Sequence, residues 1–215
     1  MAQRGEIDFR ERILADHSEV IFKAKPAAII LAAGASTRMG SVKALLEIDG
    51  ETFVDRLVRV FGTRCDPVVV VLGHHANAIR KGVRTEVIQF AENPEPDRGM
   101  LTSLQTGLRA VQDLSNGVLF TPVDVPLASP TTTSLLADAL ASGASVAVPV
   151  YRGKRGHPVA ISQRVAERLL DLPLSGRAND LMRAEASVEI TVADAGVILE
   201  VDTPEDYEEL LCHVG

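Results

Sequence analysis

A short loop near the front of the chain combines small residues with two cations. An apolar run, residues 29–33, is long enough for one buried strand and leads into a loop that contains Gly34 and Gly40. Arg38 and Lys43 lie inside this loop and at its end. Small residues let backbone N–H groups approach phosphate oxygens, and cations neutralise the charge that gathers there. The loop therefore has the composition of a binding site for a polyanion.

This glycine loop, residues 34–43, does not match the common phosphate-binding motifs. A Walker loop ends in Gly-Lys-Ser/Thr, whereas Ser41 follows Gly40. A dinucleotide fingerprint begins with Gly-x-Gly, whereas Ser36 stands two residues after Gly34, which argues against a nicotinamide-dependent oxidoreductase. The simplest alternative is an ordinary strand-to-helix turn with exposed charges, and two glycines with two cations in so short a stretch argue against it.

The order of residues in and before this loop resembles the signature of nucleotidyltransferases, Leu31-Ala32-Ala33-Gly34-x-Ser36-x-Arg38-Met39-Gly40-x-x-Lys43. The branch it is most similar to couples a nucleotide to molybdopterin, the molybdenum cofactor cytidylyltransferase-like group. The resemblance implies that the loop binds a nucleoside triphosphate, CTP being favoured, with Arg38 and Lys43 on the phosphates. By the same resemblance the nucleotide-binding residues are Leu31, Ala32, Ala33, Gly34, Ser36, Arg38, Lys43, Asn93, Gly99, Ser103 and Asp124, and the catalytic residues are Arg38, Lys43 and Asp124.

Asp124 is the second residue that we expect to take part in the chemistry. It follows a predicted buried strand, residues 117–121, at the end where ligands of open α/β sheets bind. A carboxylate beside a triphosphate needs a divalent cation between the two anions, and Mg²⁺ is usually held by one or two carboxylates plus substrate phosphates. In the resembled family this position carries the metal-binding Asp, although a small residue more often stands where this chain has Pro122. The alternative is an Asp that forms a turn or caps a helix.

Asp202 is a candidate second carboxylate for the metal. It precedes Thr203 and Pro204, and by resemblance this Asp-Thr-Pro segment returns to the site. From its residues alone the segment predicts a helix start, with Thr203 as the N-cap, Pro204 as the first residue and Asp206 close to completing a capping box.

Asn93, Gly99 and Ser103 form a group suited to contacting a nucleobase. Asn offers both a donor and an acceptor, and Ser103 lies in the first turn of a predicted helix that Gly99 opens, where N–H groups are free. The family has a similar Asn-Pro…Gly…Ser stretch, which implies nucleobase contact. A helix cap followed by a surface loop is the alternative for Asn93 and Ser103.

A basic cluster, residues 152–157, contains Arg155 and His157. It resembles the Arg-Gly-His-Pro segment of the family, which implies that these two residues bind the acceptor. From its residues alone the cluster also suits a solvated hairpin tip. Arg177 lies in a further stretch, residues 175–180, that resembles the next acceptor segment imperfectly, because the usual pattern has an extra Gly and an acid nearby.

Together these parts predict Mg²⁺-dependent nucleotidyl transfer. The phosphate of an acceptor such as molybdopterin attacks the α-phosphorus of the triphosphate in line, and pyrophosphate leaves. Two alternatives stay open: a nucleotidyltransferase for a sugar phosphate or another small phosphate, and a module that binds a nucleotide or pterin without catalysis. A molybdoenzyme or a maturation factor is the candidate partner protein.

Alternating strands and helices must position these residues. The pattern indicates an α/β protein, and the resemblance adds a three-layer sandwich around a mostly parallel, Rossmann-like sheet of the nucleotide-diphospho-sugar transferase type. The adjacent His74 and His75 are interpreted as loop histidines, because no third metal ligand is near. The predicted strands are residues 27–33, 67–72, 86–90, 117–121 and 145–150. We expect an N-terminal arm, residues 1–25, with a weak helix over 10–22, and then one nucleotidyltransferase domain, residues 26–215, in which residues 151–185 form an acceptor-side insertion.

Composition excludes several classes of protein. The chain has 215 residues, which suffices for one substantial domain. A net charge of −7, a pI of about 5.3 and 4% aromatic residues argue against a nucleic-acid partner. The cysteines, Cys65 and Cys212, fit neither a disulfide framework nor a metal site. We recognise no secretory signal and no membrane-length apolar run, and therefore expect a cytoplasmic location without membrane contact.

Overall fold

A mixed, mostly parallel sheet forms the centre of the protein. The computed structural model describes residues 25–86 and 88–214. The strands of the sheet are β1 (Ala27–Ala32), β4 (Val68–Leu72), β5 (Gln89–Glu92), β6 (Val118–Pro122), β7 (Val146–Tyr151), β8 (Lys154–Arg155), β9 (Val159–Ile161) and β10 (Ser187–Thr191). Their order is β10-β7-β9-β6-β1-β4-β5, with β8 paired to β7. β9 runs antiparallel to both of its neighbours, and the other pairs along this order are parallel.

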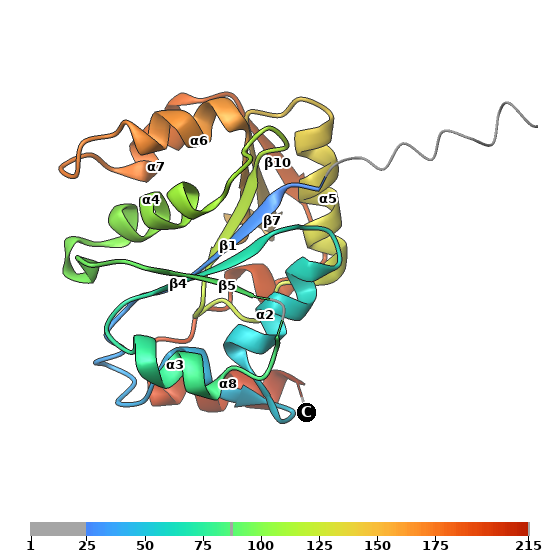
Figure 1. Ribbon diagram of the computed structural model, residues 1–215. Helices are drawn as coiled ribbons and strands as arrows, with labels where there is room; N and C mark the ends of the chain where they lie inside the picture. Colours follow the sequence, from blue (N-terminus) through green and yellow to red (C-terminus); the bar gives the residue numbers. More distant parts are fainter. Residues whose placement is uncertain (1–24, 87, 215) are drawn as a thin grey trace, which may run out of the picture.

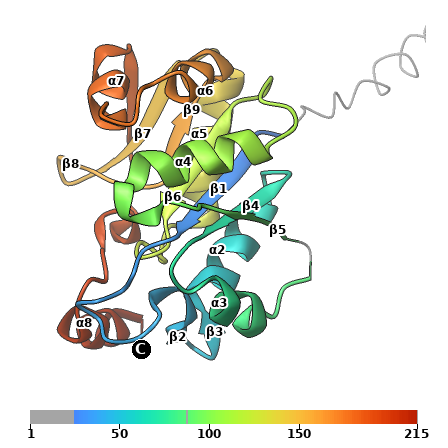
Figure 2. The same cartoon turned by 60° about the vertical axis from the view of Figure 1, so that its left-hand side comes forward.

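Helices cover both faces of this sheet, as Figure 1 shows. One face carries α4 (Met100–Ala110), α6 (Gln163–Leu170) and α7 (Ala178–Ala184), and the other carries α2 (Phe53–Gly62) and α5 (Pro130–Ala141). Two further helices, α3 (Ala76–Gly82) and α8 (Pro204–Val214), lie at the end toward which β1 runs. Near them, in Figure 2, lies the small hairpin of β2 (Glu47–Ile48) and β3 (Glu51–Thr52). This confirms the expected three-layer arrangement.

Strand β1 separates two hydrophobic cores, and all six of its residues are buried. Ile29 and Leu31 face the core that contains the apolar residues of α4 and α6. Ala28 and Ile30 face the core that contains those of α2 and of α5. A strand covered on both faces reads as a continuous apolar run, and each large side chain buried in this way contributes about 1.5–3 kcal/mol. The strand that leads into the glycine loop is therefore among the most firmly held parts of the molecule.

Three helices begin at a residue whose side chain caps the first turn. The side chain of Thr52 accepts the N–H of Asp55 at the start of α2, at 3.1 Å. The hydroxyl of Ser129, before Pro130, accepts the N–H of Thr132 at the start of α5, at 3.2 Å. At the start of α8 the Thr203 hydroxyl accepts the N–H of Asp206, and the Asp206 carboxylate accepts the N–H of Thr203. This reciprocal pair is the predicted capping box.

Several elements differ from the prediction. The third strand covers Gln89–Glu92 instead of 86–90, because β5 is a half-exposed edge strand without clear alternation. The sequence analysis gave no strand at β9 or β10 and no helix at α3. β9 has only three residues, and its place between β6 and β7 depends on the tertiary pairing. Helix α3 buries only Ile79 and so lacks an apolar periodicity. The predicted weak helix over 10–22 lies outside the described residues.

Three short 3₁₀ helices complete the described chain: η1 (Lys43–Leu45), η2 (Pro96–Arg98) and η3 (Ala195–Ile198). None of the helices in residues 25–86 and 88–214 combines the length and the hydropathy that crossing a bilayer requires.

Gly107 provides a test of how α4 packs on the sheet. A Cβ atom at this position would lie 2.6 Å from Cγ2 of Ile29 and 2.9 Å from Cγ2 of Val71. We expect Gly107→Ala to lower the free energy of unfolding by about 1–3 kcal/mol, because an overpacked interface must shift. Urea denaturation measures this. Gly62→Ala is the matched control, since a Cβ there meets nothing within 4 Å; equal stability of the two variants would contradict the packing described.

Asp55 provides a test of how α2 is tied to the chain after α3. Its carboxylate accepts the backbone N–H groups of Arg84 and Thr85, both at 3.0 Å, and the hydroxyls of Thr52 at 2.6 Å and Thr85 at 2.8 Å. Burial by itself raises the pKa of the Asp55 carboxyl, but the hydrogen bonds from Thr52, Thr85 and Arg84 outweigh it, and the pKa is lowered overall.

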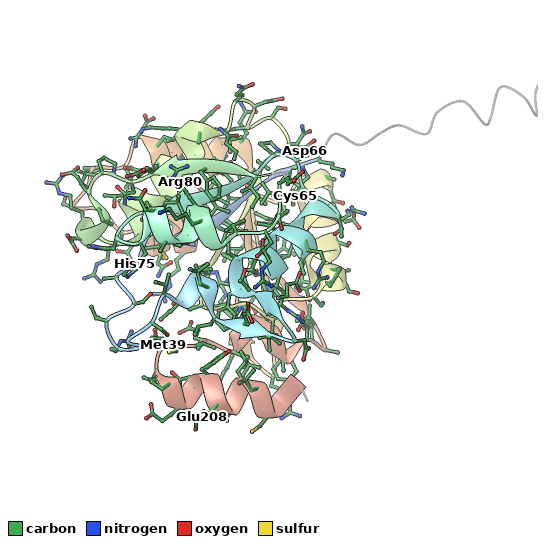
Figure 3. All side chains as sticks on the ribbon, turned by 60° about the horizontal axis from the view of Figure 1, so that its bottom comes forward. Met39, Cys65, Asp66, His75, Arg80 and Glu208 are labelled. Atoms are coloured by element: carbon green, nitrogen blue, oxygen red, sulfur yellow. The ribbon has the colours of Figure 1, made fainter. Side chains whose placement is uncertain are left out.

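We expect Asp55→Asn to cost about 1–3 kcal/mol of unfolding free energy at pH 7. Because the pKa in the folded state lies below that in the unfolded state, the stabilisation is present above about pH 4 and is lost as the pH falls through the folded-state pKa. The difference between wild type and variant should therefore shrink in acid, measured by urea denaturation at pH 7 and pH 3. Glu208→Gln, on the outer face of α8 in Figure 3, is the control. A difference in unfolding free energy between wild type and Asp55→Asn that stays constant with pH would contradict this role of the Asp55 carboxylate.

Candidate active site

Four of the residues predicted for chemistry meet at one point. Nζ of Lys43 lies 3.1 Å from Oδ2 of Asp124 and 2.5 Å from Oδ1 of Asp202. Nη2 of Arg38 lies 3.0 Å from the same Oδ1 of Asp202. We call Arg38, Lys43, Asp124 and Asp202 the charged cluster. Its members come from three segments that lie far apart in the sequence, so the fold itself assembles the cluster.

The sheet explains this assembly. β1 and β6 are parallel neighbours, so the glycine loop and the segment with Asp124 leave the sheet at the same edge. Backbone bonds then fix their relation: the N–H of Val123 donates to the carbonyl of Leu31 at 3.0 Å, and the N–H of Val201 donates to the carbonyl of Asp124 at 2.9 Å. Val201 is buried. It therefore anchors the chain one residue before Asp202 at the tip of β6.

Electrostatics favour the charged form of Asp202. The hydrogen bond from Lys43 lowers the pKa of the Asp202 carboxyl against the opposing effect of burial, and the charges of Lys43 and Arg38 add to it. The side chain of Lys43 is only 11% exposed, whereas that of Arg38 is 69% exposed. Pairs between exposed groups contribute little stability. Lys43 is therefore the buried cation of the cluster, with two carboxylate partners, and Arg38 is the exposed one, with a single partner.

Glu200 is a further acidic residue near the charged cluster, and the sequence did not single it out. Burial raises the pKa of its carboxyl, the charges of Asp124 and Asp202 raise it further, and Lys43 opposes the shift. Glu200 thus lies within electrostatic reach of Asp124, Asp202 and Lys43. The signal was present in the sequence, because Glu200 and Asp202 flank the buried Val201, and an apolar residue between two acids is typical of an extended segment with one wet side.

The glycine loop and two members of the charged cluster border a cavity of about 90 Å³. Gly34, Ser36, Lys43 and Asp124 line it, with Leu31 and Ala32 from β1. This volume suits a single group such as a phosphate, since liquid water occupies about 30 Å³ per molecule. The rest of a nucleotide would lie outside it, across the loop.

The backbone of the glycine loop leaves donors free. None of the N–H groups from Gly34 to Met39 donates to an acceptor among the described residues. Ser36 adopts a positive φ of 52°; its carbonyl accepts the N–H of Gly40, and its hydroxyl accepts the N–H of Lys43. A Cβ at Gly34 would meet no protein atom within 4 Å, so the space beside this glycine is open. Consecutive free N–H groups around a left-handed residue form an anion-binding concavity.

A larger cavity of about 400 Å³ lies on the side of Glu200. Of the predicted acceptor residues, Arg155 and His157 line it, but Arg177 does not: it lies exposed just before α7. Helix α7 instead contributes Asn179 and Arg183 to the lining. Their spacing of four residues places both on one face of the helix.

His157 differs from the other residues of this cavity. Burial lowers the pKa of its imidazole, although the charge of Asp124 opposes the shift, and the ring packs edge-on against Phe120 with centroids 6.3 Å apart. Its backbone N–H donates to the carbonyl of Val197 at 2.8 Å. The preceding Gly156 is required here, because a Cβ would lie 2.1 Å from the same carbonyl oxygen. The cavity therefore combines a neutral imidazole with the guanidinium of Arg155.

Asn93, Gly99 and Ser103 are also brought together. The Asn93 side chain is buried; its amide nitrogen donates to the hydroxyls of Thr102 and Ser103, both at 3.0 Å, and its oxygen accepts the N–H of Glu95. Gly99, with a φ of 96°, directly precedes α4. The Asn93 amide thus holds the loop before α4 in place. The N–H groups in the first turn of α4 have no acceptor within the helix and could donate to a ligand.

The two adjacent histidines lie in the loop between β4 and α3, which confirms their interpretation. The ring of His74 pairs with Asp97, and that of His75 with the carbonyl of Ala35. Across the described parts of the chain, no group of three or more His, Cys, Asp or Glu side chains is arranged to hold a metal ion.

Comparisons with known proteins agree with this geometry. The family described as "MobA-like NTP transferase domain" matches residues 28–190. A molybdenum cofactor cytidylyltransferase from Escherichia coli K12 is 29% identical over 182 residues, which are 83% of this chain and 92% of that protein. A molybdenum cofactor guanylyltransferase from Sinorhizobium fredii is 31% identical over 133 residues, which are 61% of this chain and 60% of that protein.

A solved structure shares the fold. The crystal structure of Rv0371c from Mycobacterium tuberculosis H37Rv in complex with manganese has a TM-score of 0.71 and 26% identity, and the match covers 87% of this chain and 98% of that one. The family match spans well over half of the 215 residues. The chain therefore belongs to the family of MobA-like NTP transferase domains, and it is a nucleotidyltransferase.

Proposed function

We propose that the protein transfers a cytidylyl group from CTP to a phosphorylated acceptor, molybdopterin, in the presence of Mg²⁺ and with release of pyrophosphate. The observation that carries this proposal is the meeting of two cations and two carboxylates beside a loop with free N–H groups. The cytidylyltransferase that this chain covers almost completely supports CTP as the donor. The guanylyltransferase relative makes GTP the donor to test against it.

On the nucleotide side, the chain offers donors and cations for the phosphates. The free N–H groups of the glycine loop, from Gly34 to Met39, bind the phosphate oxygens, and Lys43 and Arg38 offset the charge of the leaving pyrophosphate. Leu31, Ala32 and Ala33 form the floor of the site, and the start of α4 at Gly99 faces the nucleobase. Asn93 and Ser103 support that helix start through their mutual hydrogen bond.

The donor set of the cluster fits a divalent cation. Asp124 and Asp202 converge on one positive group, the ammonium of Lys43, and such a pair of carboxylates plus substrate phosphates is what Mg²⁺ requires. A bound cation would neutralise charge at the α-phosphate. If such a cation were held between these oxygens, Lys43 would release them, and its ammonium would be free to pair with the phosphates. Glu200 is a further acid near the pair: burial raises the pKa of its carboxyl, and the charges of Asp124 and Asp202 raise it further.

On the acceptor side, the larger cavity offers groups that could bind a phosphorylated acceptor. Arg155 and Arg183 supply positive charge at its lining, and the neutral His157 supplies a hydrogen-bonding ring without charge. Glu200 also lines this cavity, and its carboxyl senses the charges of Asp124 and Asp202. An acceptor phosphate that enters this cavity would attack the α-phosphorus in line, with pyrophosphate leaving on the opposite side. Arg177 contributes only if its exposed side chain folds over the cavity.

A panel of substrates tests the proposal. Pyrophosphate release is measured with each of CTP, GTP, ATP and UTP against molybdopterin and against hexose 1-phosphates, with Mg²⁺ present. Release with CTP and molybdopterin supports the proposal. Release with a sugar phosphate alone would assign the chain to that other class of acceptor, and tight nucleotide binding without any release would indicate a binding module.

Lys43→Ala and Asp124→Asn should each reduce kcat by about 10²–10³, the loss that follows removal of one group that stabilises developing charge. Pyrophosphate release under saturating substrate measures the effect, and circular dichroism shows whether each variant is folded. Lys81→Ala, in the exposed last turn of α3, is the control and should keep the wild-type kcat. A near-normal rate in either site variant would refute the assignment.

Lys43→Met should strengthen metal binding while it weakens catalysis. Without the ammonium, the two carboxylates hold uncompensated charge, and we expect the affinity for Mn²⁺ in the absence of nucleotide to rise by about tenfold or more, from the loss of a competing cation at close range. Electron paramagnetic resonance of free Mn²⁺ measures this directly. Lys81→Met is the control. Unchanged or weaker Mn²⁺ binding in Lys43→Met would show that the ammonium and the metal do not share these oxygens.

A further inference from the structure

We propose that His75 is a positioning residue for the nucleotide: its ring holds the peptide plane between Ala35 and Ser36, so that the N–H of Ser36 is presented to the triphosphate. This inference rests on the proposed function, because it takes the glycine loop as the phosphate-binding element. It adds a residue from a separate segment, the loop between β4 and α3, to the machinery of the site.

Two contacts join that loop to the chain at the start of the glycine loop. Nε2 of His75 lies 2.9 Å from the carbonyl oxygen of Ala35, and the backbone N–H of His74 donates to the carbonyl of Ala33 at 3.3 Å. The preceding Gly73 permits this close approach, since a Cβ there would lie 2.5 Å from the Ala33 oxygen. Figure 3 shows His75 beside the blue loop that carries Met39.

The geometry of a trans peptide turns these contacts into a directional constraint. In each trans peptide the C=O and the following N–H point to opposite sides. When the carbonyls of Ala33 and Ala35 are held toward the β4–α3 loop, the N–H groups of Gly34 and Ser36 point away from it. Neither N–H donates to an acceptor within the described part of the chain. Gly34 and Ser36 also line the cavity that Lys43 and Asp124 share.

Ser36 is the residue that most needs such support. Its φ of 52° is in the left-handed region, which a residue other than glycine keeps only when its surroundings hold it. Two of its restraints come from within the glycine loop, from the N–H groups of Gly40 and Lys43. The bond from His75 to the preceding carbonyl comes from outside the loop, and so it anchors the loop to the rest of the fold.

The chemistry of the contact identifies which group of His75 is needed. A carbonyl oxygen only accepts, so Nε2 of His75 must carry the proton, and it does so in one neutral tautomer and in the cation alike. The contact therefore needs a donor at this position and does not need a charge. A Gln side chain offers an N–H donor of similar reach, whereas an Ala side chain offers none.

His75→Ala should raise the KM for the nucleoside triphosphate about tenfold and leave kcat within about twofold, as expected for one lost hydrogen bond that orients a binding group. His75→Gln should restore most of the wild-type KM. His74→Ala is the matched control: its ring pairs with the exposed Asp97, and its backbone bond to Ala33 survives the substitution. Unfolding midpoints without nucleotide should be alike for His74→Ala and His75→Ala.

Binding of a non-hydrolysable CTP analogue, measured calorimetrically with Mg²⁺, gives a second readout that does not depend on turnover. An unchanged KM and affinity in His75→Ala, an equal loss in His74→Ala, or no recovery in His75→Gln would each overturn the inference while the proposed function stands. If the wild type bound no nucleoside triphosphate, the proposed function would fail and the inference with it.

Discussion

The site depends on one charge balance, the ammonium of Lys43 between the carboxylates of Asp124 and Asp202. The distances of 3.1 Å and 2.5 Å bring two negative groups closer together than they would stay without a cation between them. The hydrogen bond from Lys43 lowers the pKa of the Asp202 carboxyl, whereas burial, and after it the charges of Asp124 and Asp202, raise the pKa of the Glu200 carboxyl. The cluster therefore holds two carboxylates close together around one ammonium, which is the donor set that the proposed metal site needs.

The fold maintains this balance by fixing the backbone of the segments that carry the charged residues. Parallel β1 and β6 deliver the glycine loop and Asp124 to one edge of the sheet, and a second device delivers the late acids. The carboxylate of Asp194 accepts the N–H groups of Ser129 and Gly196, at 2.8 Å and 3.0 Å, and so ties η3 to the start of α5. At Gly196 a Cβ would lie 2.3 Å from the carbonyl oxygen of Leu127, so the chain passes too close for any side chain. Glu200 and Asp202 follow from this anchored point.

How much of this the sequence predicts depends on whether the signal is local. Some features are encoded within a few consecutive residues, and the structure confirms them. They are strand β1, the glycine loop and the capped starts of α2, α5 and α8. Asp124 was predicted from its place after a buried run. Three features depend on contacts between distant segments, which no short stretch of sequence encodes. They are the antiparallel strand β9, the lining of the larger cavity by Arg183 instead of Arg177, and the contact of His75 with Ala35. Glu200 combines both situations. Its alternation with Asp202 can be seen in a short stretch of sequence, whereas its proximity to Asp124 depends on the fold.

Nucleotide binding requires Arg38 and Lys43 to exchange their carboxylate partners for phosphates. The unequal exposure of these two cations suggests the order in which they do so. Arg38, at 69% exposed, gives up a weak pair with Asp202 at little cost, and its long side chain reaches solvent. Lys43, at 11% exposed, gives up two contacts inside the site and needs a replacement charge at once. In the proposed reaction Arg38 would therefore meet the incoming phosphates first. Lys43 would follow only when the carboxylates have gained a divalent cation, so that the triphosphate and its metal enter as one complex.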